Sequence, residues 1–167
     1  MNNNFSIAQY TPDRREVCVD LFQKVYGSPP FNFDWLDRSK AYMYFSDLEN
    51  IPNALNYVLT DENGIFGVCM GQKEDNFQNP GYKINEFFIE PDHQHMGIGT
   101  HFINELEKIL HESGIKTMYL FTQRSMDSFS FYQNNGFIPN DETVHMVKII
   151  RQEPTVLYTR TYMNSEN

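Results

Sequence analysis

The chain has 167 residues, a length at which most chains fold as one domain. Its net charge of −9 disfavours nucleic acid and anionic membrane surfaces as partners, because both attract basic proteins. No apolar run approaches the ~20 residues of a membrane span, and the amino-terminal residues lack the basic and apolar regions of a signal peptide. We therefore expect a cytoplasmic protein in which Cys18 and Cys69, each within an apolar run, are buried free thiols.

The first half of the chain combines short strands with two helical segments. The pattern predicts, in chain order, a strand at 5–9, a helix that begins at Thr11-Pro12 and ends at Gly27, a segment at 31–50 that is helical in its second half, and strands at 55–59 and 65–70. Asp61-Glu62-Asn63-Gly64 is typical of a hairpin turn between those two strands. The residues from 72 to 81 are polar, and we expect them to leave the sheet.

The second half shows a strand–helix–strand–helix order. The pattern predicts a strand at 82–89 stopped by Pro91, a long amphipathic helix at 97–113 closed by Gly114, a buried strand at 117–122, a helix at 127–135 and late strands at 144–150 and 156–162. The predicted fold is therefore α/β, with one mixed, mostly antiparallel central sheet flanked by helices. We expect a single domain over residues 1–167.

The residues that join the strand at 82–89 to the long helix carry the clearest chemical signal. Gln94-His95-Met96-Gly97-Ile98-Gly99 places two glycines directly before the helix. A helix begins with free N–H groups and a partial positive charge, and glycine lets the backbone approach an anion closely. The pattern fits a diphosphate held without lysine, although a tight turn that only caps the helix has the same composition. It lacks the Gly-Lys-Ser/Thr end of a Walker loop and the third glycine of a dinucleotide fingerprint.

Two motifs resemble the signatures of one family. Residues 90–99, Glu-Pro-Asp-His-Gln-His-Met-Gly-Ile-Gly, are similar to the acyl-CoA signature of the GNAT N-acetyltransferases, Gln/Arg-x-x-Gly-x-Gly/Ala. About forty residues later, Phe131-Tyr132-Gln133-Asn134-Asn135-Gly136-Phe137 resembles the second signature of that family. Pro29-Pro30-Phe31-Asn32 is similar to an acceptor-side segment in one branch. The likeness covers most of the chain and implies a GNAT-like fold.

The resemblance implies that acetyl-CoA is the acetyl donor and that a primary amine attacks it directly. It implies an acceptor-side half at about 1–80, an acetyl-CoA-binding core at about 82–150 and a carboxy-terminal strand at 155–163. The expected contacts to acetyl-CoA come from one strand end, the glycine loop and the start of the last helix, namely Phe88, Ile89, Gln94, His95, Met96, Gly97, Ile98, Gly99, Thr100 and Ser125. Many relatives carry asparagine where this chain has Ser125, so the serine either contacts the donor or caps the helix.

Two side chains are candidates for proton transfer. Glu86 lies on the strand that leads into the loop and is the candidate base for the attacking amine, although an exposed strand carboxylate would look the same. The resemblance implies Tyr132 as the acid for the departing thiolate; hydrogen bonding to the sulfur, or plain packing under the helix, are the alternatives. Histidines occur near the loop without a matching carboxylate or cysteine set, so we expect no metal.

The acceptor side is less specific. Phe31 and Trp35 are candidate substrate-binding residues, and packing of the first helices onto the sheet would explain them equally well. The acidic chain favours a cationic small-molecule or peptide amine. A non-catalytic acyl-CoA-binding or regulatory module with the same fold is the alternative function. The late strand at 156–162 is a candidate edge for a homodimer.

Overall fold

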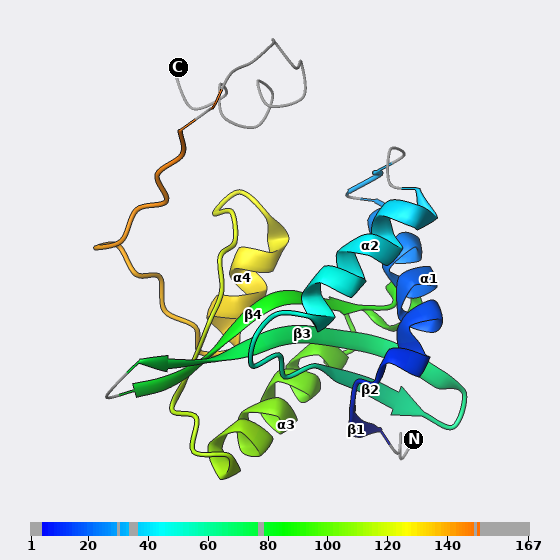
Figure 1. The fold of residues 1–167 in the computed structure, drawn as a ribbon, viewed down its shortest axis with the longest axis horizontal. Helices are drawn as coiled ribbons and strands as arrows, with labels where there is room; N and C mark the ends of the chain where they lie inside the picture. Colours follow the sequence, from blue (N-terminus) through cyan, green and yellow to red (C-terminus); the bar gives the residue numbers. More distant parts are fainter. Residues whose placement is uncertain (1–4, 30, 34–36, 77–78, 149, 151–167) are drawn as a thin grey trace. The chain divides into compact units, whose positions relative to one another are not determined.

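The computed structural model describes residues 5–29, 31–33, 37–76, 79–148 and 150 (Figure 1). In chain order the elements are β1 (Ser6–Gln9), the 3-10 turn η1 (Pro12–Arg14), α1 (Arg15–Tyr26), α2 (Arg38–Glu49), β2 (Tyr57–Asp61), β3 (Gly64–Asn76), β4 (Asn79–Ile89), the 3-10 turn η2 (Pro91–His93), α3 (Ile98–Glu112), β5 (Thr117–Tyr119) and α4 (Asp127–Asn134). Contacts divide the chain into two units, Met1–Phe137 and Ile138–Asn167. All of these elements belong to the first unit, and one domain over 1–167 stays a prediction.

The sheet is mixed and mostly antiparallel, which confirms the predicted fold class. In the described residues its strands follow the order β1-β2-β3-β4-β5, with antiparallel pairs from β1 to β4. β5 pairs in parallel with β4, and the crossover between them runs through α3. None of the described helices is both long and apolar enough to cross a lipid bilayer.

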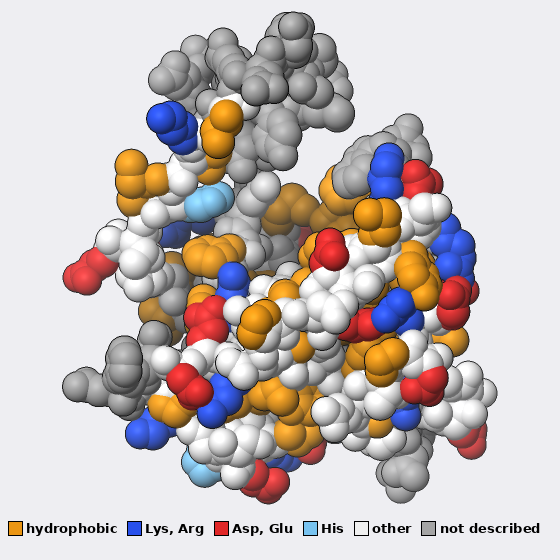
Figure 2. Space-filling view, in the orientation of Figure 1, with side chains coloured by type: hydrophobic (Ala, Val, Ile, Leu, Met, Phe, Trp, Pro, Cys, Tyr) orange, Lys and Arg blue, Asp and Glu red, His pale blue; other side chains and the backbone are white. Residues whose placement is uncertain are grey.

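Each face of the sheet packs against its own set of helices. Along β2, Val58 belongs to the core under α1 and α2, whereas Tyr57 and Leu59 belong to the core under α3. This alternation follows from the two-residue period of a strand. Figure 1 shows α1 and α2 together, away from α3. On the exposed side of these two helices acidic and basic side chains intermingle (Figure 2), as in the ion pairs of Arg38 with Glu16 and Asp20.

The two cysteines agree with the expectation from their apolar surroundings. Cys18 lies on the buried face of α1 and Cys69 lies on β3 in the core under α3, and both are free thiols with no exposed surface. Burial raises the pKa of each thiol to about 12, so both stay protonated at neutral pH. Their role is therefore packing rather than nucleophilic attack.

Three predicted segments differ from the structure. Residues 72–81 do not leave the sheet, because β3 continues to Asn76 and β4 begins at Asn79 as a polar hairpin. Polar cross-strand contacts, such as the amide of Asn85 donating to Gln72 at 3.1 Å, replace the apolar pattern that would have identified these strands. Hydrophobic periodicity cannot detect a strand pair that extends past the core.

The predicted strand at 117–122 is shorter than expected and only half-buried. β5 ends at Tyr119, and Phe121 is 75% exposed. The predicted strand at 144–150 is wrong, since residues 144–148 and 150 form no strand. An alternating apolar pattern makes a strand only where another strand supplies hydrogen bonds, and no described segment pairs with this one. The predicted strand at 156–162 lies outside the described residues.

Candidate functional site

The edge of β4 opens towards its carboxyl end. β5 pairs only with Gly81–Lys83 of β4, so in the described residues the stretch from Ile84 to Ile89 has a strand neighbour on one side only. A register shift between Met70 and Gly71 of β3 accompanies this change. The unpaired edge offers backbone donors and acceptors to an extended ligand, as an edge strand does to a peptide. The open edge could therefore pair with an extended ligand beside the end of β4.

Residues 90–99, which we call the motif loop, join β4 to α3. The loop is tied down at its start, since Lys24 of α1 contacts Glu90 at 2.7 Å and Asp92 at 2.8 Å. The side-chain amide of Gln94 donates to the carbonyl of Ile89 at 2.8 Å, which fixes the loop to the end of β4. The side chain of Gln94 therefore stabilises the conformation of the loop itself.

The two glycines of the motif loop are required for different physical reasons. Gly97 is the N-cap of α3 at φ 77°, in the left-handed region, and a Cβ there would meet nothing within 4 Å. Glycine is therefore required at position 97 by the left-handed backbone conformation and not by a lack of space. At Gly99 a Cβ would lie 3.1 Å from the ring of Phe131 in α4, so a small residue lets the two helices approach. His95 shares the positive φ, at 59°.

The start of α3 is available to an anion. Its N-cap is Gly97, so the capping position has no side chain to bond the terminus, and the first N–H groups of any helix have no intrahelical acceptor. Met96, next to the N-cap, is 64% exposed. Left-handed residues at His95 and Gly97, followed by the first helical turn with Ile98 and Thr100, are typical of backbone nests that bind phosphate. These residues fit the diphosphate of acetyl-CoA.

Four side chains from four elements form what we call the Glu86 cluster: Glu86 of β4, Tyr26 of α1, Tyr44 of α2 and Tyr132 of α4. Tyr26 donates to one oxygen of the carboxylate at 2.8 Å, and Tyr44 donates to the other at 2.7 Å. Burial raises the pKa of Glu86, while the two phenol hydrogen bonds act in the opposite direction. Glu86 is thus not the exposed strand carboxylate that would have been the alternative.

Tyr132 is packed in an aromatic environment beside the same carboxylate. Its ring lies 5.2 Å from that of Phe131, 5.3 Å from Phe137 and 6.4 Å from Phe87. Burial first, and then electrostatic interaction with Cys69 and Glu86, raises the pKa of Tyr132. The structure therefore brings Tyr132 close enough to Glu86 for an electrostatic interaction, and it keeps the phenol protonated.

The predicted acceptor side is described in part. Phe31 lies in an aromatic cluster with Tyr26 and Phe33, at centroid distances of 4.8 and 5.8 Å. Trp35 lies outside the described residues. Tyr26 links this cluster to Glu86, and neither Tyr26 nor Tyr44 was identified from the sequence. The only local signal for them is a tyrosine on the apolar face of each helix, which ordinary core packing also produces.

The structure limits what three residues of the predicted donor site can do. Phe88 and Ile89 point into opposite cores, so only their backbone is available to a ligand. The N-cap of α4 is Met126, without a side-chain cap bond, so the helix-capping role considered for Ser125 is wrong. A serine one residue before the N-cap is outside the position from which a hydroxyl caps.

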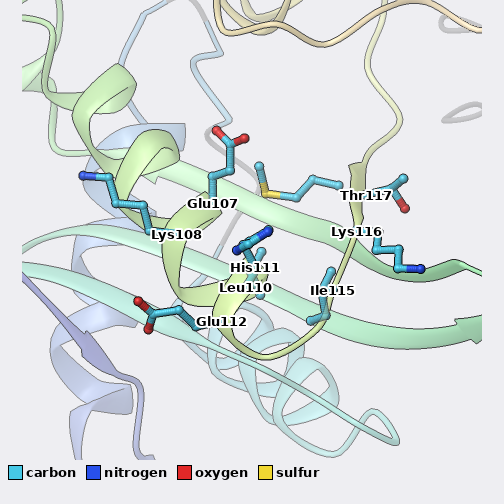
Figure 3. A pocket seen from close by; sticks show the side chains of 9 residues that line it. Glu107, Lys108, Leu110, His111, Glu112, Ile115, Lys116 and Thr117 are labelled. Carbon is cyan, nitrogen blue, oxygen red and sulfur yellow. The ribbon is translucent and has the colours of Figure 1, made fainter.

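A separate hollow lies at the far end of α3. It has a volume of about 400 Å³ and is lined by α3 residues such as Glu107 and His111 and by the start of β5 (Figure 3). It contains no residue of the motif loop or the Glu86 cluster. Among the described residues no group of three or more His, Cys, Asp or Glu side chains is arranged to hold a metal ion.

The sequence defines the class of protein that carries this site. The profile of the Acetyltransferase (GNAT) family matches residues 19–137, which include β4, the motif loop and the Phe131–Phe137 motif. The chain belongs to the acetyltransferase (GNAT) family. No match was found among the curated proteins.

Solved structures share the fold at low sequence identity. A possible acetyltransferase from Clostridium difficile 630 is 13% identical with a TM-score of 0.72, covering 88% of this chain and 99% of that chain. An aminoglycoside acetyltransferase from an uncultured soil metagenomic sample, in complex with sisomicin, is 18% identical with a TM-score of 0.67, covering 90% and 99%. AAC(6')-Iy, in complex with a bisubstrate analogue of CoA and acetylneamine, is 14% identical with a TM-score of 0.65, covering 88% and 99%.

Proposed function

We propose that this chain is an N-acetyltransferase that moves the acetyl group of acetyl-CoA to a primary amine. The observation that carries the proposal is that one strand, β4, joins two kinds of chemistry. It bears the partly buried carboxylate of Glu86 and ends three residues later at Ile89, where the motif loop leads into the uncapped start of α3. A proton acceptor and an anion site thus flank one unpaired strand edge.

The proposed donor site is made from backbone groups. The amides from Gln94 to Thr100 hold the diphosphate of acetyl-CoA, and the edge at Phe88 and Ile89 faces the thioester arm. The complex of a structural neighbour with CoA supports this choice of donor. A backbone donor near Ile89 that faces the thioester carbonyl would stabilise the developing oxyanion, a contribution often worth ~2.7–4 kcal/mol.

The proposed acceptor is an amine that must lose a proton before it attacks. An alkylammonium has a pKa of ~10.4, so its deprotonation at pH 7 costs roughly 4–5 kcal/mol. Glu86 takes this proton, directly or through water, as the nitrogen bonds to the acetyl carbon and the carbon–sulfur bond breaks. A cationic amine suits the acidic chain. Neighbours solved with aminoglycosides support an amine carried by a small molecule.

Tyr132 is proposed to stabilise the departing sulfur as a hydrogen-bond donor. Full transfer from a phenol of pKa ~10 to a thiolate of pKa ~8.5 is uphill by about 2 kcal/mol. Because burial raises the pKa of Tyr132 further, proton donation becomes still less favourable. The hydroxyl therefore keeps its proton and shares it with the thiolate, and the thiol acquires its own proton from water.

The test is a thiol-release assay with acetyl-CoA across a panel of amines. The panel contains an aminoglycoside, a polyamine, an amino acid amide and a peptide with a free amino terminus. We expect amine-dependent release of CoA together with an acetylated amine of matching mass. Saturable binding of acetyl-CoA without release for any amine would instead support the non-catalytic acyl-CoA-binding module.

A further inference from the structure

The carboxylate of Glu86 is held from two sides by phenols of the amino-terminal helices. Tyr26 is the last residue of α1 and donates to Oε2 at 2.8 Å, and Tyr44 lies within α2 and donates to Oε1 at 2.7 Å. Each oxygen of a carboxylate offers about two acceptor positions. The two phenols occupy one position on each oxygen and leave one free on each.

Both phenols are themselves fixed by neighbouring rings. The ring of Tyr26 packs against those of Phe22 and Phe31, at centroid distances of 4.4 and 4.8 Å. The ring of Tyr44 lies 5.7 Å from Phe22, which is buried and contacts both tyrosines. The two hydroxyls are therefore preorganised by the packing of α1 on α2, and Glu86 cannot rotate without breaking a hydrogen bond.

We propose that Tyr26 and Tyr44 are positioning residues that orient Glu86 and keep it ionised, so that its free acceptor positions face the nitrogen of an acceptor amine. The inference rests on the proposed function, in which Glu86 is the base. It assigns the acceptor half of the site to α1 and α2, and it gives each helix one hydroxyl with a defined task. Without these donors, burial would favour the protonated form of Glu86 more strongly.

The electrostatic surroundings explain why two donors are needed. The titratable groups that the described residues place around Glu86 are the phenols of Tyr26, Tyr44 and Tyr132 and the thiol of Cys69. All are neutral at physiological pH, because burial first, and then nearby negative charge, raises the pKa of each of the three phenols, and burial does the same for the thiol. Burial alone makes the ionised carboxylate unfavourable, and hydrogen bonds to the charged form offset part of that cost.

The first test measures Glu86 directly and needs no turnover. The carboxyl carbon of ¹³C-labelled glutamate is followed by NMR against pH in the free protein, and the Glu86 signal is assigned by its absence in Glu86→Gln. In Tyr26→Phe and in Tyr44→Phe the Glu86 titration is expected to move upward by roughly one to two pH units, since each variant loses a hydrogen bond to a charged group. Tyr119→Phe, which removes a phenol that donates to Glu74, is expected to leave it unchanged.

The second test follows the acidic limb of kcat/KM for the amine in the same variants. This limb reports the ionisation of the free enzyme's base, so it is expected to move upward with the Glu86 titration in both tyrosine variants. Unchanged NMR titrations in folded Tyr26→Phe and Tyr44→Phe proteins would overturn the inference. A protein that shows the NMR shifts but acetylates no amine would instead refute the proposed function and leave the role of the phenols in the ionisation of Glu86 standing.

Discussion

The motif loop and the Glu86 cluster lie at the two ends of the same stretch of β4, yet they are built in opposite ways. The motif loop is one continuous segment whose proposed chemistry comes from backbone N–H groups and from the conformations of His95 and Gly97. The Glu86 cluster takes side chains from α1, α2, β4 and α4, separated by up to 106 positions between Tyr26 and Tyr132. A site made of backbone is local in sequence, whereas a site made of side chains depends on the tertiary fold.

This difference predicts how each region responds to substitution. A change in the Glu86 cluster is expected to alter the rate of transfer and its dependence on pH while leaving the affinity for acetyl-CoA intact. A change in the motif loop is expected to alter that affinity first. The assignment of the two regions would be wrong if variants of the Glu86 cluster mainly lost affinity for acetyl-CoA, or if variants of the motif loop mainly changed the rate and its pH dependence.

The largest expected effect is that of Glu86→Gln. Loss of a general base typically costs about 10²–10⁴-fold in rate, and we expect a loss of this size in kcat/KM for the amine at pH 7. The loss should shrink as the pH approaches the pKa of the amine, because the amine in solution is then already deprotonated. Steady-state kinetics from pH 6 to 10 measure it, with Glu74→Gln, a carboxylate that also accepts a tyrosine hydroxyl, as the matched control.

Glu86→Gln also carries a stability prediction of defined sign. Burial raises the pKa of Glu86 in the folded state, so folding binds a proton more tightly. The ionised side chain therefore costs stability in full above the folded pKa, and that cost declines as the pH falls from the folded pKa to the lower pKa of the unfolded chain. The glutamine variant is expected to unfold at a temperature no lower than the wild type at pH 7. A clearly lower midpoint in thermal unfolding would mean that Glu86 is a structural residue.

The next effect is that of Tyr132→Phe. A hydrogen bond to a charged atom contributes about 1.5–3 kcal/mol, so kcat is expected to fall by roughly 10- to 100-fold. The KM for acetyl-CoA should stay close to that of the wild type, because the phenol acts on the sulfur as it departs. Wild-type kcat in this variant would leave Tyr132 with packing as its only role.

A smaller effect, in the other region, is expected from Gly97→Ala. The left-handed conformation costs an alanine roughly 1–2 kcal/mol, and relief of that strain would rearrange the loop and weaken acetyl-CoA binding about tenfold. Gly114→Ala is the matched control, since Gly114 lies just beyond the other end of α3 with the same φ of 77° and equally open space. Both variants should lose similar stability in denaturant, but only Gly97→Ala should lose affinity.

The smallest effect is expected from Lys24→Ala. The lysine contacts Glu90 and Asp92 at the start of the motif loop from an exposed position, with its side chain 45% accessible. Exposed ion pairs contribute little because water and salt screen them. The KM for acetyl-CoA is expected to change by less than about threefold. A larger change would show that α1 controls the loop.

The contrast between the two regions also explains what the sequence could predict. The motif loop, the mixed sheet and the long helix from Gly97 follow from local signals: two glycines, a proline after a strand and an apolar period of 3.6 residues. Glu86 and Tyr132 were proposed as site residues from motifs and position, and the structure places them in one cluster. The hydrogen-bonding partners of Glu86 were not predicted, because Tyr26 and Tyr44 meet Glu86 only when α1 and α2 pack on one face of the sheet.

The errors have the same origin. The polar hairpin at the ends of β3 and β4 is stabilised by strand pairing rather than by a buried face, so its composition resembled a loop. The segment 144–150 has the alternation of a strand but no described strand beside it. In the first case the segment pairs with another strand, and in the second no described strand pairs with it. Local composition predicts neither outcome, because strand pairing depends on distant parts of the chain.

The central claim is that backbone amides at the start of α3 bind the diphosphate of acetyl-CoA. Calorimetric titration of the wild-type protein with acetyl-CoA, and in parallel with S-acetylpantetheine, which has the thioester arm but no diphosphate, tests it most directly. We expect saturable 1:1 binding of acetyl-CoA and binding of S-acetylpantetheine that is at least about 100-fold weaker. Equal affinities, or no saturation by acetyl-CoA at millimolar concentration, would contradict the account.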